Sequence, residues 1–281
     1  MGCMEIPSTR VAVVTGAGSG IGRELALACA RRGMTVVGAD VERPALEETE
    51  HLLRELGTPC RMQQCDVTRS ADVERLAQDC SDECGGVDWL FNNAGVATLG
   101  PVWQATESDW AWVLGVNLLG VANGVRAFVP RMLERGTRAH VVNTASAAGL
   151  ATLAGSGVYC ASKHGVVALS ECLAHDLAAV GAPIGVSVLC PSLLPSRIHE
   201  AARNRPAALA DAAAEPAAAK QRVHAGMAGS TVSARDAAEA TLCAIDAGRF
   251  YVLPHAQTGV SVRRRMASIL TDFEQLHPEQ S

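Results

Sequence analysis

The sequence predicts an α/β protein with one seven-stranded, doubly wound parallel sheet and helices on both faces, in a single domain of 281 residues. Short aliphatic runs alternate with longer segments of helical periodicity, and this order requires parallel strands joined by right-handed crossovers. Hydrophobic residues make up 48% of the chain but aromatic residues only 4%, as expected for a sheet sandwiched between helices. Such sheets bind ligands beyond the carboxyl ends of their strands.

The predicted elements follow one another in strict alternation. The strand-like runs lie at residues 10–15, 34–39, 60–65, 88–92, 140–144, 185–190 and 250–253. The helical segments lie at residues 21–32, 44–56, 71–83, 108–133, 158–180 and 234–247. Gly33, Gly57 and Gly181 stand just after three of these helices and are predicted to end them.

Residues 193–230 interrupt the alternation, because they are rich in Ala, contain three prolines and carry no strand signal. A connection of this length is usually a lid or a binding loop. The alternative is a pair of surface helices that only covers the sheet. Residues 1–8 and 262–281 are predicted to be terminal tails, and docking on a neighbouring subunit is the alternative for the second.

A glycine-rich turn follows the first strand. It reads Thr15-Gly16-x-x-x-Gly20-x-Gly22, and the next helix begins within it. Glycine lets the main chain approach a phosphate closely, and N–H groups at a helix N-terminus attract the anion. The turn therefore predicts a dinucleotide site that includes Gly16, Ser19, Gly20, Ile21 and Gly22.

Tyr159 and Lys163 are four residues apart in a predicted helix, so their side chains share one face. A free phenol has a pKa of about 10, and a nearby cation favours its ionised form. Ser146 lies thirteen residues before Tyr159. These residue types predict acid–base chemistry.

In this order the two motifs resemble the short-chain dehydrogenase/reductase family, whose signatures are T-G-x-x-x-G-x-G and a Y-x-x-x-K preceded by serine. The resemblance continues through Asn92-Asn93-Ala94-Gly95, Asn117 and the segment after Cys190, and covers residues 9 to 255. It implies a Rossmann-type fold, an enzyme acting on CH–OH groups, and a homotetramer (or homodimer) formed through the helices at 108–133 and 158–180.

The resemblance also implies residue roles. Tyr159 donates or accepts the alcohol proton, Lys163 lowers the pKa of Tyr159 and holds the nicotinamide ribose, Ser146 hydrogen-bonds the reacting oxygen, and Asn117 anchors a water that relays the proton. Further cofactor contacts are implied for Asp66, Val67, Asn93, Ala94, Gly95, Pro191, Leu194 and Ser196. Ser192 stands where the family usually has glycine, which bears on the main-chain contact of Leu194.

Asp40 predicts NAD rather than NADP. It ends the second strand, eighteen residues after Gly22, where a carboxylate accepts hydrogen bonds from the adenosine ribose. Asp40 and Glu42 would repel a 2′-phosphate, and neither Ser19 nor Val41 is a compensating cation. Arg43 is expected to be exposed.

Composition excludes other classes. The net charge of −5 argues against a nucleic-acid partner. The ten cysteines are scattered without zinc-ligand spacing, so no metal is expected. No apolar run approaches the roughly 18 to 20 residues of a membrane span, which favours a cytoplasmic protein.

The expected pocket is apolar and favours a secondary alcohol or ketone as substrate. Its predicted lining is Val96, Ala97, Leu99, Ala147, Leu153, Leu193 and Ile198. Two alternatives stay open, namely a ketoreductase of a biosynthetic pathway and an NAD-binding redox sensor or scaffold without turnover.

Overall fold

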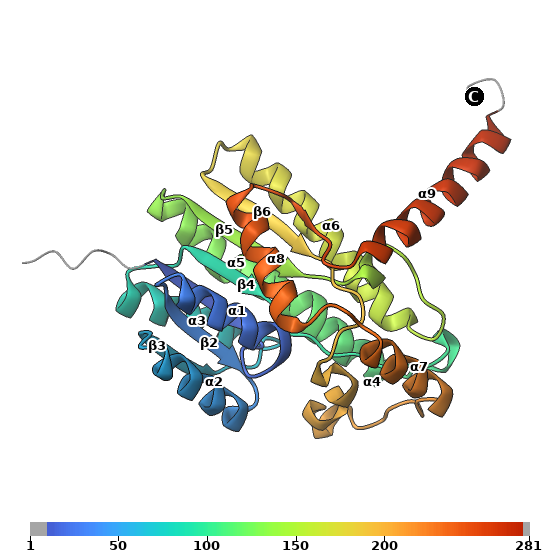
Figure 1. Cartoon of the computed structure of the whole chain (residues 1–281), viewed down its shortest axis with the longest axis horizontal. Helices are drawn as coiled ribbons and strands as arrows, with labels where there is room; N and C mark the ends of the chain where they lie inside the picture. The colour runs from blue at the N-terminus through green and yellow to red at the C-terminus, as the bar shows by residue number, and fades with distance from the viewer. Residues whose placement is uncertain (1–9, 278–281) are drawn as a thin grey trace, which may run out of the picture.

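The computed structural model describes residues 10–277 and contains one parallel sheet with helices on both faces (Figure 1). The strands are β1 (Val11–Thr15), β2 (Thr35–Asp40), β3 (Cys60–Gln64), β4 (Trp89–Asn92), β5 (Ala139–Thr144), β6 (Ile184–Leu189) and β7 (Tyr251–Val252). Their order in the sheet is β3-β2-β1-β4-β5-β6-β7. The order reverses between β1 and β4, where a doubly wound sheet opens a crevice for ligands. The predicted fold class and all seven strands are confirmed.

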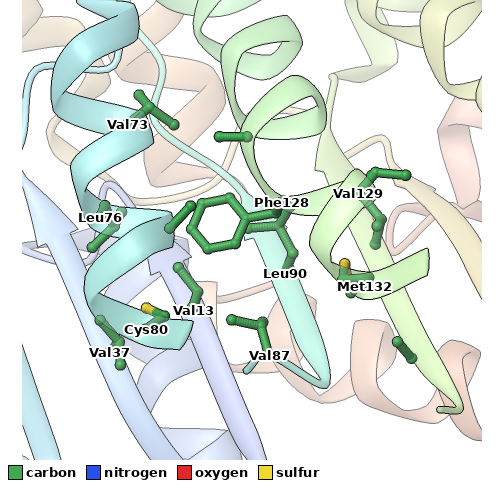
Figure 2. Packing of buried hydrophobic residues seen from close by; sticks show 14 of the residues in the cluster. Val13, Val37, Val73, Leu76, Cys80, Val87, Leu90, Phe128, Val129 and Met132 are labelled. Atoms are coloured by element: carbon green, nitrogen blue, oxygen red, sulfur yellow. The ribbon is translucent and has the colours of Figure 1, made fainter. Parts of the chain in front are cut away.

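Alternate residues of each strand pack against opposite helix layers. Val13 of β1 belongs to one core cluster, and its neighbour Val14 belongs to the other. Figure 2 shows the first layer, where Phe128 lies beside Leu90 of β4, and Leu76 belongs to the same cluster. The helices of the first layer are α3 (Ser70–Cys84), α5 (Gly120–Arg135) and α6 (Gly157–Ala179). Those of the second are α1 (Gly20–Arg31), α2 (Arg43–Glu55) and α8 (Ala234–Asp246).

The long helix predicted at 108–133 has a break in its middle. Helix α4 (Glu107–Leu114) runs into a π-helical turn, η2 (Gly115–Leu119), before α5 begins. Such π-turns are frequent at functional sites. The whole stretch Glu107–Arg135 is apolar and long enough to cross a membrane by length and composition, yet more than half of its most apolar window is buried inside the fold. It is a core helix here.

The segment 193–230 contains no strand, as its sequence indicates, whereas the C-terminal segment differs from the prediction. The segment 193–230 contains the 3₁₀ helices η4 (Arg197–Asn204) and η5 (Ala207–Leu209) and the helix α7 (Ala217–Ala228). The predicted tail from residue 262 is instead part of helix α9 (Ala256–Leu276), which projects from the body (Figure 1). The apolar residues of α9 recur at helical spacing, but none of them belongs to a core cluster of the described residues. The predicted tail at 1–8 and residues 278–281 lie outside the described residues.

Candidate active site

A cavity of about 500 Å³ runs along the carboxyl edge of the sheet. Every predicted site residue lines it except Gly22 and Asn117. Loops that follow six different strands therefore meet in one place. All seven apolar residues predicted for the pocket also line it.

The glycine turn forms a cradle at the start of α1. Gly16 and Gly20 have φ angles of +67° and +53°, a region that side chains disfavour. A Cβ atom at Gly16 would lie 2.9 Å from the Ala94 Cα atom, and one at Gly22 would collide with the Gly16 carbonyl oxygen. The first turn of α1 carries no acidic residue. Gly22 thus closes the turn, and the cradle fits the diphosphate of a dinucleotide.

Asp40 is held at the end of β2, facing the cavity. Its Oδ2 atom accepts a hydrogen bond from the Gly18 N–H at 2.9 Å, and its Oδ1 atom accepts one from the Glu42 N–H at 3.0 Å. Burial raises the pKa of Asp40 above its ordinary value, and the bonds from Glu42 and Gly18 oppose the rise. These bonds hold the carboxylate in the cavity wall at the carboxyl end of β2.

Glu42 makes a contact that the sequence did not predict. Its Oε1 atom lies 2.6 Å from Arg203 Nη2 and 2.8 Å from Asn204 Nδ2, both in η4. Residues 193–230, named the lid below after their predicted role, thus bring a guanidinium beside Glu42 and pair it there. No local signal connects residues 161 positions apart. Arg43 is exposed and pairs with Glu47, as expected.

Ser146, Tyr159 and Lys163 line the cavity at its other end. Tyr159 and Lys163 both lie in the first two turns of α6. The Ser146 hydroxyl accepts a hydrogen bond from the Ala148 N–H at 3.1 Å and donates to the Pro191 carbonyl at 3.3 Å. Lys163 is 2% exposed, and its Nζ atom donates to the Thr144 carbonyl at 2.8 Å.

In this arrangement the pKa of Tyr159 is raised rather than lowered. Burial raises the pKa of Tyr159 to about 12, and the Ser146 hydroxyl only partly offsets the rise. The Lys163 Nζ atom is 5.8 Å from the centroid of the tyrosine ring, and it points to Thr144. Burial also lowers the pKa of Lys163 to about 8. Desolvation therefore outweighs the attraction between the two groups.

Asn117 lies in the π-turn, beneath the cavity. Its Oδ1 atom accepts from the Val96 N–H at 2.8 Å, and its Nδ2 atom donates to the Val96 carbonyl and to Ser162 Oγ. These bonds join the loop after β4 to α6. The side chain thus connects the elements that carry the pocket wall and Tyr159, and its role in a proton relay stays a prediction.

The loop after β6 accommodates Ser192 without strain. Among residues 10–277, no residue other than glycine has a positive φ. The Ser192 N–H donates to Nδ1 of buried His255 at 3.1 Å. Leu194 is buried and lines the cavity with Ser192 in place, and its main-chain contact with a cofactor stays a prediction.

The cavity wall is otherwise largely apolar, and one hydrogen bond between the Leu99 loop and residues 193–230 lies beside it. Trp112, Val223 and Met227 line the cavity in addition to the predicted residues. The Leu99 N–H donates to the Glu215 carboxylate at 3.1 Å. Sequence reasoning missed Glu215, Val223 and Met227, because the segment 193–230 has no strand or motif signals that would give its register against the sheet.

A buried ion pair anchors the lid. Arg205 Nη1 lies 2.6 Å from Asp109 Oδ1, and the two side chains are 8% and 3% exposed. Burial alone would raise the pKa of Asp109, but hydrogen bonds from Arg205, Thr106 and Ala213 lower it overall. Within residues 10–277 no cluster of His, Cys, Asp and Glu side chains is arranged to hold a metal ion.

Known proteins resemble this chain over most of its length. The family model described as short chain dehydrogenase matches residues 10–207. A solved short-chain dehydrogenase/reductase from Burkholderia phymatum in complex with NAD is 43% identical, with a TM-score of 0.92 over 94% of this chain and 95% of that one.

Two curated relatives agree with this match. The 1-deoxy-11-beta-hydroxypentalenate dehydrogenase of Streptomyces arenae is 36% identical over 91% of this chain and 86% of its own length. A CLA biosynthesis dehydrogenase/reductase of Lactiplantibacillus plantarum is 30% identical over 94% of both chains. Because both family signatures lie in one cavity and these matches span nearly the whole sequence, the chain belongs to the short-chain dehydrogenase family.

Proposed function

We propose that this oxidoreductase transfers hydride between NAD(H) and a largely apolar secondary alcohol or ketone, with Tyr159 as the acid–base group. One observation carries the proposal. Ser146, Tyr159 and Lys163 line the same cavity as the glycine cradle and Asp40. NAD supplies the hydride chemistry when bound, and the protein supplies orientation and proton handling.

Three side chains of the protein, those of Tyr159, Lys163 and Ser146, take part in the proton transfer. With a pKa of about 12, the Tyr159 phenol keeps its proton at neutral pH, which suits a donor to the oxygen of a ketone being reduced. In oxidation the phenol must first lose that proton, and the Lys163 ammonium, 5.8 Å from the ring centroid, favours the phenolate. The Ser146 hydroxyl would hydrogen-bond the reacting oxygen.

The adenosine end supports NAD as the cofactor. Asp40 offers a carboxylate to ribose hydroxyls and repels a 2′-phosphate. The nearby guanidinium of Arg203 is engaged by Glu42 at 2.6 Å. The solved relative from Burkholderia phymatum holds NAD.

The pairing of the arginines in the lid supports the proposal that the substrate is neutral. Arg197, Arg203 and Arg205 are the basic residues best placed to hold a carboxylate, and each is paired with an acid of the same chain. The rest of the substrate end is mainly apolar. Such a pocket discriminates only modestly between related alcohols. Several expectations stay predictions. They are a lid function for 193–230, a cytoplasmic location, a homotetramer, a small-molecule partner, and the absence of a nucleic-acid or membrane partner.

The test is an absorbance screen for NADH formation with cyclic, aromatic, steroidal and aliphatic secondary alcohols. We expect turnover with NAD and little with NADP. Tyr159→Phe is the control, because it removes the acid and little volume. It should lower turnover by about 10²–10⁴-fold, while a calorimetric titration gives nearly the same NAD affinity. Full activity of Tyr159→Phe would refute the acid–base role, and NAD binding without any turnover would favour the sensor or scaffold alternative.

A further inference from the structure

Helix α9 exposes a row of large apolar side chains. Met266, Ile269, Leu270 and Phe273 are each 46–53% exposed, and Leu276 is 77% exposed. Figure 1 shows the helix leaving the body after its first turns. Of its described residues only Thr258 is fully buried. This surface is costly to leave in water.

The apolar residues form one stripe. Val262, Met266, Ile269, Phe273 and Leu276 are separated by four, three, four and three residues. This spacing is the a/d repeat of a helix that packs lengthwise against another helix. In proteins most of the stability of a helix comes from packing of its amphipathic face, so the stripe calls for a second helix.

The charges of α9 match those of its own copy. Arg263, Arg264 and Arg265 lie in its first half, and Asp272 and Glu274 lie in its second half. A two-fold axis across the helix would align two copies antiparallel and bring each basic half beside an acidic half. The Arg265 side chain also donates to the Leu150 carbonyl at 3.2 Å, which leaves other guanidinium N–H groups free for a second partner.

In the antiparallel alignment each residue of the stripe also lies against a residue of the partner helix. If Met266 lies against Ile269 of the partner subunit, Val262 lies against Phe273 of the partner subunit. Gly259 then lies against Leu276 of the partner subunit, and a Cβ atom at Gly259 would meet only the tip of Arg263 within 4 Å, so that position is open. In this register Arg265 comes near Asp272 of the partner subunit.

We propose that α9 is a self-association surface, on which a second copy of this chain packs its own α9 antiparallel along the stripe. This surface is separate from the helices 108–133 and 158–180, through which the family resemblance implies assembly. The proposal concerns assembly and does not depend on the reaction or its substrate.

The test compares two neighbouring substitutions in the full chain by sedimentation equilibrium. Ile269→Glu places a charge in the stripe, whereas Ser268→Glu places the same charge beside it on an exposed position. We expect Ser268→Glu to keep the wild-type mass and Ile269→Glu to halve it. A charge-reversal set is independent of the helix's own stability: Arg265→Glu and Asp272→Arg should each weaken association, and the double variant should restore it.

Equal masses for Ile269→Glu and the wild type would overturn the proposal, as would a monomeric wild type. A monomer that co-sediments with vesicles of phosphatidylcholine and phosphatidylserine would assign the stripe to a lipid surface instead. Failure of the double variant to regain association would reject the antiparallel register. None of these outcomes bears on NAD-dependent turnover.

Discussion

The cofactor end and the lid are built in different ways. At the cofactor end, a short motif folds on itself between β1 and α1, and Gly16, Gly20 and Gly22 create the cradle with local backbone geometry. The lid has no such motif. Polar contacts with distant parts of the chain hold it: Arg203 to Glu42, Arg205 to Asp109, and Glu215 to the Leu99 N–H.

This difference separates two properties of the site. The dinucleotide cradle is part of the folded sheet, so it persists as long as the sheet does. The lid depends on a few side chains, so its position and the shape of the substrate end can change without unfolding the sheet. Variation in substrate is therefore easier to accommodate than variation in cofactor.

Arg205→Met should have the largest effect, because it leaves the Asp109 carboxylate without its buried partner. Breaking a buried ion pair from one side costs about 3–5 kcal/mol. We expect this cost to appear as local opening of the lid, measured as faster hydrogen exchange at residues 197–215, while α1 and β1 keep their protection. The double variant Arg205→Met/Asp109→Asn should recover part of the loss. Equal acceleration in the sheet would show that lid and core open together.

The sequence predicted the sheet and most of the cavity because their signals are local. Each strand is a short aliphatic run, and parallel strands end at one edge, so motifs after Thr15, Asn92 and Thr144 had to meet there. The contacts of Glu42 and Asp109 were missed, because ion pairs between residues 161 and 96 positions apart leave no periodic trace in the sequence. Helix α9 is a different case, because its apolar residues do recur at helical spacing and the residues from 262 were nevertheless interpreted as a tail.

Lowering the pH should destabilise the core rather than the lid, because His140 is buried in β5. Burial lowers the pKa of His140 to about 4, and its Nε2 atom lies 2.8 Å from Ser187 Oγ. Unfolded histidine has a pKa of about 6.5, so between pH 6.5 and 4 the unfolded chain binds the extra proton. The free energy of unfolding therefore falls as the pH falls through this window, by up to about 3 kcal/mol.

The measurement is urea unfolding at several pH values for the wild type and His140→Gln. The variant should lose stability at neutral pH but show a smaller decline between pH 6.5 and 4. Parallel declines of the two proteins would exclude His140 as the source.

Asp40→Ala should sharpen the account of the cofactor end. Removing one carboxylate near a 2′-phosphate relieves a repulsion of about 1–2 kcal/mol, which is about a ten-fold gain in kcat/KM with NADP. The value for NAD should fall, since the ribose loses its acceptor. Steady-state kinetics with both cofactors measure the change, and Asp40→Asn separates charge from size. Unchanged NADP kinetics in both variants would refute the electrostatic explanation.

Glu42→Gln should have the smallest effect. It tests whether the lid also influences the choice between NAD and NADP. Glu42 engages Arg203 and Asn204 in a pair that is about one quarter exposed, so the contact itself is worth at most about 1 kcal/mol. Without the carboxylate charge, the Arg203 guanidinium is free to approach a 2′-phosphate. We expect kcat/KM with NADP to rise a few-fold, with NAD nearly unchanged.

Arg203→Met in the Glu42→Gln background is the matched control, because it removes the released cation and keeps most of the side-chain volume. It should return the NADP kinetics to the wild-type level. If the gain survives in the double variant, the carboxylate of Glu42 repels the phosphate directly and the lid plays no part. If the gain disappears, a residue of the lid contributes to cofactor choice, and the two ends of the site are coupled through Glu42.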